Sequence, residues 1–277
     1  MVEDGSEFYF DLKGIGDGIL EKSTVIGIIA GLISVFVGMI IKGAPLSSMA
    51  NPAAFLIIIG GTFSCLLNAF PMDTVTKLPT LFKILLRAED NGGKGELVKT
   101  FIELSQVARR EGILALEGKV QDINDSFFRN GLSMVIDGMD PDFVSDVLDA
   151  ELAVMEERHA EARSILTQAG TYAPTLGVLG AVVGLIAALA DLSDVNKLGH
   201  AISAAFIATI LGIFTGYVIW LPFANKLKVK SASEISHKRM IIEGILSLQA
   251  GDSPTAIEAK LMVFIPQKER EAIKGGE

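Results

Sequence analysis

The residues that could do chemistry in this chain are few and far apart. The sequence has three histidines, His159, His200 and His237, and one cysteine, Cys65. A single cysteine forms neither a disulfide within the chain nor a cysteine-based metal site. Histidines this distant in sequence do not follow the spacing of a metal-binding motif. We therefore expect no metal and no other cofactor.

The four most apolar runs of the sequence contain no Asp, Glu, Lys, Arg or His. Their polar side chains carry mainly hydroxyl and amide groups. Transporters and pumps usually carry ionisable side chains inside the membrane, where these bind ions or relay protons. If protons cross here, another protein must supply the titrating carboxylate. A threonine in such a run often only bonds its own helix. The polar residues of these runs include Ser34, Thr62, Ser64, Asn68, Thr171, Tyr172, Thr175, Ser203, Thr209, Thr215 and Tyr217.

The four apolar runs are Thr24–Ile41, Pro52–Phe70, Thr171–Ala190 and Ala201–Phe223. Each is close to the roughly 20 residues that cross a bilayer as a helix. In hydrocarbon the backbone groups must bond within the segment, so the runs are predicted to be helices. We predict an all-α membrane protein with four transmembrane helices. A helical cytoplasmic domain would lie between the second and third spans, and a helical cytoplasmic tail would follow the fourth.

Lysine and arginine predict the orientation. The short connections Lys42–Asn51 and Asp191–His200 contain one lysine each, out of 24 basic residues in the chain. By the positive-inside rule both termini and the middle segment are expected on the cytoplasmic side of the membrane. The expected parts are a cytoplasmic arm (1–23), a first hairpin (24–70), a cytoplasmic domain (71–170), a second hairpin (171–223) and a tail (224–277).

The cytoplasmic segments are expected to be helical. An amphipathic helix is predicted in "VTKLPTLFKILLRAE", a loop in "DNGGKGE", and a helix in "ELVKTFIELSQVARREG" that ends near Gly112. Another helix is predicted to begin at Asn124 or Asp125. A long helix is predicted from Pro141, with Asp140 as its cap. Nothing in the sequence breaks this helix before Gly170, so it is expected to enter the third span directly, and the fourth span is expected to continue into the tail.

Small residues form a stripe on each of the last two spans. Such stripes let membrane helices approach closely. The simpler interpretation is tight packing within a bundle; the alternative is a surface for a ring of copies around a thin partner such as a helix. The stripes comprise Pro174, Gly177, Ala181, Gly184 and Ala188, with Gly180 completing a GxxxG pair, and Ala201, Ala205, Ala208 or Thr209, Gly212 and Gly216.

Long stretches resemble the flagellar motor stator A subunits, the MotA/PomA family, which is related to the ExbB and TolQ energisers. They include "TQAGTYAPTLGVLGAVVGLIAAL", "LGHAISAAFIATILGIFTGYVIWLPFANKLK", "NPAAFLIIIGGT", "ARREGILALE" and "MIIEGIL". The resemblance implies a location in the inner membrane of a bacterium, and there a ring of five A subunits around two single-span B subunits, whose Asp binds the ion. It also implies a rotor switch protein as partner, and neither enzymatic activity nor nucleic-acid binding.

The resemblance also implies roles for individual residues. Pro174 and Pro222 match prolines thought to couple ion passage to movement, and Thr209 matches a hydroxyl facing the ion path, on which we also place Tyr217. Ala181 is expected to face the same path. Sodium-driven relatives tend to carry Thr there, so protons are expected rather than sodium. Arg109, Arg110 and Glu117 match charges that meet the rotor, although charged residues on a solvated helix need no function.

Two alternatives remain. An ExbB/TolQ-like energiser of an outer-membrane process would use the same ion chemistry. Those proteins have three spans with the cytoplasmic segment after the first, whereas four are predicted here with that segment after the second. A membrane enzyme or transporter is the other alternative. The charge-free spans and the absence of a catalytic or metal-binding constellation in the sequence argue against it.

Overall fold

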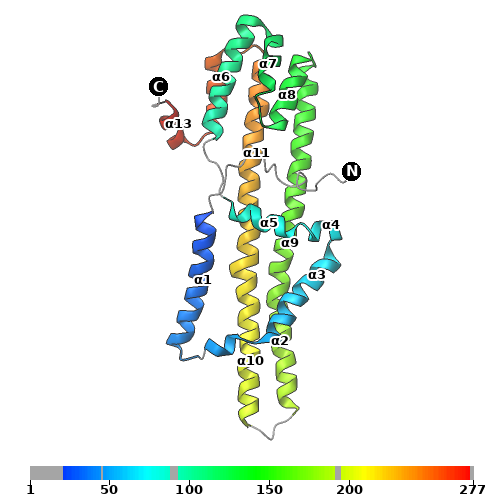
Figure 1. Ribbon diagram of the computed structural model, residues 1–277, viewed down its shortest axis with the longest axis vertical. Coiled ribbons are helices and arrows are strands. Elements are labelled where there is room, and N and C mark those ends of the chain that lie inside the picture. The colour runs from blue at the N-terminus through cyan, green and yellow to red at the C-terminus, as the bar shows by residue number, and fades with distance from the viewer. Residues whose placement is uncertain (1–20, 45, 88–92, 191–194, 275–277) are drawn as a thin grey trace. The chain divides into compact units, whose positions relative to one another are not determined.

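The computed structural model describes residues 21–44, 46–87, 93–190 and 195–274, and these residues are mostly helical (Figure 1). Nearly all of the predicted N-terminal arm lies outside the described residues. The long helices follow the apolar runs and the amphipathic segments of the sequence. This agreement is expected, because a helix is the one element that satisfies every backbone group within a single apolar segment.

Four helices in the described part of the chain are long and apolar enough to cross a membrane. The first is α1 (Lys22–Ile41), and the second runs from Pro52 to Ala69. The third span lies within α9 (Pro141–Leu189), and the fourth within a continuous helix from Leu198 to Gln249. The predicted all-α fold with four spans is therefore confirmed.

Two of these helices contain π-helical segments. The second span consists of α2 (Pro52–Phe55), the π-helical segment η4 (Leu56–Gly60) and α3 (Gly61–Ala69). The long fourth helix begins with α10 and continues through the segment η6 into α11. Their bounds are Val195–Phe214 for α10, Thr215–Trp220 for η6 and Leu221–Gln249 for α11.

The chain packs as two units, each built from two stretches of sequence. Among the described residues, the span unit comprises those from 21 to 87 and from 160 to 228, and the lobe comprises those from 93 to 159 and from 229 to 274. Residues 229–274 thus complete the packing of the lobe although they follow the fourth span in sequence. The predicted borders at 71, 171 and 224 refer to the membrane surface and stay predictions.

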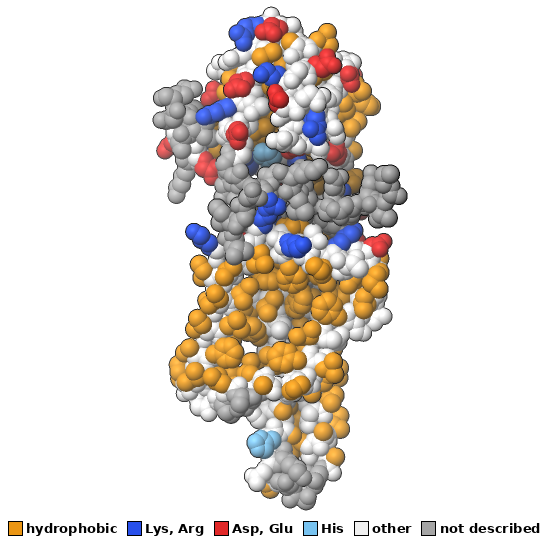
Figure 2. Space-filling view, in the orientation of Figure 1, with side chains coloured by type: hydrophobic (Ala, Val, Ile, Leu, Met, Phe, Trp, Pro, Cys, Tyr) orange, Lys and Arg blue, Asp and Glu red, His pale blue; other side chains and the backbone are white. Residues whose placement is uncertain are grey.

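The span unit has a small core and a largely apolar outer surface. Its buried residues come from the spans themselves: Met39, Ala54, Ile58, Ala173, Ile207, Ala208 and Leu211. Hydrophobic side chains cover most of the visible face of the spans, as Figure 2 shows. Exposed large apolar residues such as Ile26, Leu56 and Ile186 fit contact with lipid rather than with water.

A short amphipathic helix borders these spans. The helix predicted in "VTKLPTLFKILLRAE" is α5 (Leu78–Leu86), and a separate short helix, α4 (Met72–Val75), precedes it. The helix starts afresh at Leu78 because Pro79 stands in its first turn, where a missing N–H costs nothing. Phe82 packs edge-on against Trp220 and Phe223 and so holds α5 against the fourth span.

The long helix α9 begins as the sequence predicts. Pro141 occupies its first position, and the Asp140 carboxylate accepts the Asp142 N–H at 2.9 Å. The helix then runs without interruption for 49 residues, through Gly170 and Pro174, to Leu189. The predicted direct entry into the third span is confirmed. A proline inside the helix is tolerated where the neighbouring helix packs tightly against it.

The lobe contains α6 (Gly93–Glu111), η5 (Ile113–Leu116), α7 (Glu117–Val120), α8 (Ser126–Ile136), α12 (Pro254–Met262) and α13 (Gln267–Lys274). All of these except α13 contribute, with the lobe parts of α9 and α11, to a core of buried residues such as Phe101, Phe127 and Ile245. Helix α8 was predicted to begin at Asn124 or Asp125; it begins at Ser126, and Asp125 is its N-cap, which accepts the N–H groups of Phe127 and Phe128.

The predicted loop "DNGGKGE" is wrong at its end, because α6 already begins at Gly93 and includes Gly95. Glycine lowers helix stability by only about 1 kcal/mol, which tertiary contacts can offset. Lys94 provides such contacts, since its ammonium donates to the Ser236 hydroxyl at 3.1 Å and to the Phe264 carbonyl at 3.3 Å. At the other end the prediction is confirmed: Gly112 follows the helix with φ +88°.

Candidate functional site

Helices α9 and α10 are in direct backbone contact where the two small-residue stripes face each other. A Cβ atom added to Gly177 would lie 2.9 Å from the Cα atom of Gly212 and 2.9 Å from the Ala208 carbonyl oxygen. A Cβ atom added to Gly212 would lie 2.7 Å from the Ala173 carbonyl oxygen. The two backbones therefore touch, and neither glycine has room for a methyl group.

Pro174 is held in the same contact. A Cβ atom on Gly216 would lie 2.7 Å from Cγ of Pro174 and 2.9 Å from the Gly170 carbonyl oxygen. Pro174 has no N–H, so the Gly170 carbonyl loses its normal partner four residues ahead in the helix. Gly216 thus makes space for both the proline ring and the carbonyl that the proline releases.

The contact loosens toward the end of the hairpin. A Cβ atom on Gly180 would lie 3.4 Å from Cβ of Ala208, and one on Gly184 would lie 3.8 Å from Cβ of Ala205. These are tolerable distances, unlike those at Gly177 and Gly212. The geometry favours the simpler of the two interpretations, tight packing within one chain, for Gly177, Gly180, Gly184, Ala205, Gly212 and Gly216. A contact of these residues with a partner's helix stays a prediction.

The hydroxyl groups of the spans bond to their own helices. Thr209 Oγ1 donates to the Ala205 carbonyl at 3.2 Å, which is the ordinary structural role of a membrane threonine. Thr215 Oγ1 lies 2.8 Å from the Leu211 carbonyl and 3.1 Å from the Gly212 carbonyl. The Thr209 oxygen keeps its own lone pairs, so it can still accept a hydrogen bond or coordinate a cation.

The remaining ion-path candidates differ in exposure. Pro174, Ala181 and Thr209 are half-buried, Pro222 is exposed, and Tyr217 is 64% exposed. Gly180 contacts Ala208, and Ala181 and Thr209 are their direct neighbours in sequence. Ala181 and Thr209 therefore lie at the same level of the hairpin.

Sequence reasoning missed the π-helical segment η6, which ends just before Pro222. In it the Leu221 N–H donates to the Gly216 carbonyl, five residues back. A proline at 222 cannot donate, and its ring crowds the carbonyl four residues before it, so a widened turn relieves the clash. Pro222 in an otherwise unbroken apolar helix was the available signal. Two more contacts were missed, since Gly31 and Gly61 accommodate Val218 and Leu176.

The candidate rotor-contact residues lie around the connection between α6 and α7 of the lobe. Arg109 and Arg110 are in the last turn of α6, and Glu117 is the first residue of α7. All three are exposed, and within the described part of the chain none of them is in an ion pair. Arg110 Nε donates to the Gln106 carbonyl at 3.2 Å. Two cations and an anion are thus exposed on the surface of the lobe.

Among the described residues no group of His, Cys, Asp and Glu side chains is suited to hold a metal ion. The lobe does contain a half-buried histidine, His237, whose pKa is shifted. Burial lowers the pKa of His237, the positive charges of Lys238 and Lys94 lower it further, and the Asp125 carboxylate opposes them.

Acidification is expected to destabilise the lobe through His237. Its pKa is lower in the folded than in the unfolded chain, so its contribution to stability is full above about pH 6.5 and is lost as pH falls through the folded pKa. Thermal unfolding in detergent, measured from about pH 7.5 down to about pH 5.5, would test this. His237→Gln should flatten the dependence, and an equal slope in the variant would contradict the assignment.

The comparisons with known proteins agree with this architecture over nearly the whole chain. Residues 25–112 match the family described as "Motility protein A N-terminal", and residues 119–240 match the "MotA/TolQ/ExbB proton channel family". Motility protein A of Bacillus subtilis is 52% identical over 251 residues, which are 91% of this chain and 93% of that protein.

Solved structures show the same fold. The flagellar MotAB stator complex from Bacillus subtilis contains a chain with 52% identity and a TM-score of 0.85, covering 90% of this chain and 98% of that one. The C. jejuni MotAB structure gives a TM-score of 0.82 at 29% identity, covering 89% of this chain and 96% of that one. The resemblance read from the sequence is confirmed, and the relatives favour it over the ExbB/TolQ alternative. The chain belongs to the flagellar stator A proteins, the motility protein A branch of the MotA/TolQ/ExbB proton channel family.

Proposed function

We propose that this chain forms, with a single-span B subunit, an ion channel of the bacterial flagellar motor that converts ion flow into torque on the rotor. The observation that carries the proposal is the match of nearly the whole chain, at 52% identity and with a TM-score of 0.85, to a MotAB stator complex. The chain would have no enzymatic role. Its apolar outer faces would contact membrane lipid, and five copies would surround two B subunits.

The charge-free spans support a channel that is completed by a partner. No Asp, Glu, Lys, Arg or His lies in the four predicted apolar runs, so the B subunit would supply the Asp that binds the ion. The ion path of this chain would include Pro174, Ala181, Thr209, Tyr217 and Pro222. Neutralising the partner's carboxylate would change its contact with the ring of small residues, and the ring would step around the B subunits.

Torque would leave the molecule through the lobe. Each charge that crosses the membrane releases about 2.3 kcal/mol per 100 mV of potential. Helix α9 and the helix from Leu198 to Gln249 each continue without a break from a span into the lobe, so movement of a span can be transmitted along them. Arg109, Arg110 and Glu117 would meet the rotor switch protein.

Complementation tests the proposal directly. The chain, expressed with its B subunit in a bacterium that lacks its own stator genes, should restore swimming. The two proteins should also co-purify as a ring when only one of them carries a tag. Failure to rotate the flagellum, despite normal amounts of both proteins in the membrane, would refute a stator function.

The proposed topology predicts which introduced cysteines react from outside. In a Cys65→Ala background, Ser48→Cys and Ser193→Cys should react in spheroplasts with an impermeant thiol reagent. Gln106→Cys, at an exposed position of α6, should react only after the membrane is opened. The measurement is labelling with a mass tag on a gel. Labelling of Gln106→Cys in intact spheroplasts would reverse the orientation.

Charge reversal at the rotor contact is expected to weaken torque. Exposed ion pairs each contribute only about 0–1 kcal/mol, so single changes should have small effects. Combining Arg109→Glu, Arg110→Glu and Glu117→Lys should markedly lower stall torque, and reversed charges on the rotor should restore part of it. Lys119→Glu, an exposed change in the same lobe, is the matched control. Unchanged stall torque in the triple variant would place the contact elsewhere.

A further inference from the structure

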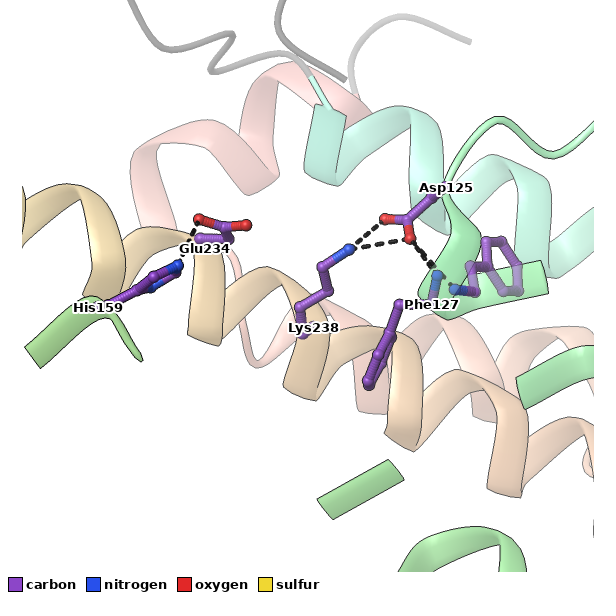
Figure 3. Close-up of polar contacts among 6 residues, drawn as sticks. Asp125, Phe127, His159, Glu234 and Lys238 are labelled. Atoms are coloured by element: carbon purple, nitrogen blue, oxygen red, sulfur yellow. Dashed lines mark hydrogen bonds and ion pairs between the residues drawn. The ribbon is translucent and has the colours of Figure 1, made fainter. Parts of the chain in front are cut away.

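A buried ion pair in the lobe lies outside the predicted ion path and rotor contact. Lys238 of α11 is 4% exposed, and its ammonium lies 2.9 and 2.8 Å from the two carboxylate oxygens of Asp125 (Figure 3). The ammonium also lies 5.2 Å from the centre of the Phe127 ring. Burying a lysine is unfavourable unless it is paired, so this geometry is held by a specific partner.

Asp125 has a second role in the same place. One of its oxygens accepts the N–H groups of Phe127 at 2.9 Å and Phe128 at 3.2 Å, which caps the first turn of α8. One carboxylate thus fixes the start of α8 and binds the ammonium of α11. The nearby contact of His159 with Glu234, also in Figure 3, joins α9 to α11 and does not involve α8.

Helices α6 and α8 each pack closely against α11 at a glycine. A Cβ atom on Gly244 would lie 2.4 Å from Cζ of Phe101, so the ring of α6 rests directly on the α11 backbone. Phe101 in turn stacks on Phe128 of α8 at 4.7 Å. On the other side, a Cβ atom on Gly131 of α8 would lie 2.5 Å from Cδ1 of Ile245. Helices α6 and α8 are therefore both fixed to one stretch of α11.

The candidate rotor-contact residues lie in the segment between Phe101 and Asp125, and both ends of this segment are fixed to α11 by the contacts just described. Arg109 and Arg110 end α6, Glu117 begins α7, and α8 follows after Asp125. Helix α11 belongs to the continuous helix that starts at Leu198 in the fourth span. Asp125 and Lys238 hold the far end of this segment on the helix that leads from the span.

We propose that Asp125 and Lys238 are positioning residues for torque, which link the fourth-span helix to the rotor-contact segment. The inference rests on the proposed stator function. The ionic link keeps the start of α8 on α11 under load, so that a movement of α11 displaces the charged surface instead of bending the connection between them. A neutral pair of similar size would preserve the fold but would yield when the rotor resists.

The test separates this role from plain stability. Lys238→Met keeps the stem and the Asp125 cap. Asp125→Asn keeps the cap but removes the negative charge beside a buried ammonium, which should lower thermal stability. The double variant Asp125→Asn/Lys238→Met removes both charges and should recover stability. Lys238→Arg keeps the charge and should preserve function. Lys260→Met is the matched control, because Lys260 pairs with Glu243 and Asp252 and does not reach α8.

The measurement is stall torque per stator unit, taken from the speed steps as units join a motor, together with thermal stability. The double variant should assemble and melt like the unmodified chain, yet give torque per unit lower by about twofold or more, while the controls stay unchanged. Full torque per unit in the double variant would overturn the proposal, as would torque that merely follows stability across the series. Absence of steps with the unmodified chain would instead refute the stator function itself.

Discussion

Gly177→Ala and Gly212→Ala are each expected to abolish motility, whereas Gly184→Ala should preserve it. In the first two variants the new methyl group would lie less than 3 Å from backbone atoms of the facing helix, which cannot rotate away as a side chain can. The helices would have to separate, and overpacking of this kind costs about 1–3 kcal/mol. At Gly184 the nearest atom would be 3.8 Å away, so the same methyl group fits.

The measurement is swimming in soft agar, with the membrane content of each variant determined by immunoblotting. Gly177→Leu should behave at least as badly as Gly177→Ala, because the added bulk is larger. Gly184→Ala is the control, because it adds the same methyl group to the same helix at a position where there is room for it. Normal swimming of both Gly177→Ala and Gly212→Ala would show that α9 and α10 do not touch at these residues in the working protein.

Helices were predictable from the sequence where a local pattern, such as the length of an apolar run or a capping residue, determines them. The four apolar runs have the length of membrane helices, and Asp140 and Pro141 provide a helix start, so α9 and the spans were placed closely. The loop ahead of α6 was misjudged because its glycines are overridden by Lys94, whose partners Ser236 and Phe264 are distant in sequence. Local rules cannot anticipate such contacts.

The candidate site was only partly predictable for the same reason. A stripe of small residues indicates close packing, but the sequence does not say which helix packs there; the structure shows α9 against α10 of the same chain at Gly177 and Gly212. The Asp125–Lys238 pair joins residues 113 positions apart, and each is an ordinary surface residue type. Gly244, which contacts Phe101, belongs to the stretch "MIIEGIL". The family resemblance pointed to this stretch, but nothing in the sequence indicated the contact.

Rotation is expected to stop when the proton gradient is collapsed and to continue when external sodium is reduced to traces. Sodium must exchange its water shell for several oxygen ligands arranged around it, as hard cations require. A proton needs only the partner's carboxylate and a transient relay through water or a hydroxyl. The relevant question is therefore how many oxygen atoms the spans can offer at one level of the hairpin.

Few oxygen atoms that could bind a sodium ion lie near Thr209. The Thr209 oxygen has its hydrogen bonded to the Ala205 carbonyl, which leaves its lone pairs for one contact with an ion or a water. Ala181 lies at the same level and contributes only a methyl group. The Gly170 carbonyl, released by Pro174, lies against Gly216 and about three helical turns away from Ala181 along α9. One hydroxyl and one carboxylate suit a proton better than sodium.

Swimming speed at fixed proton-motive force, measured while external sodium is lowered, tests this choice, with and without a protonophore. Speed should ignore sodium and fall to zero with the protonophore. Ala181→Thr adds an oxygen at the level of Thr209 and should make speed sodium-sensitive or impair it, whereas Ala181→Val adds similar bulk without an oxygen and serves as the steric control. Speed that follows sodium and survives the protonophore would reverse the assignment. A sodium response in Ala181→Val equal to that in Ala181→Thr would show that bulk, rather than the added ligand, controls the path.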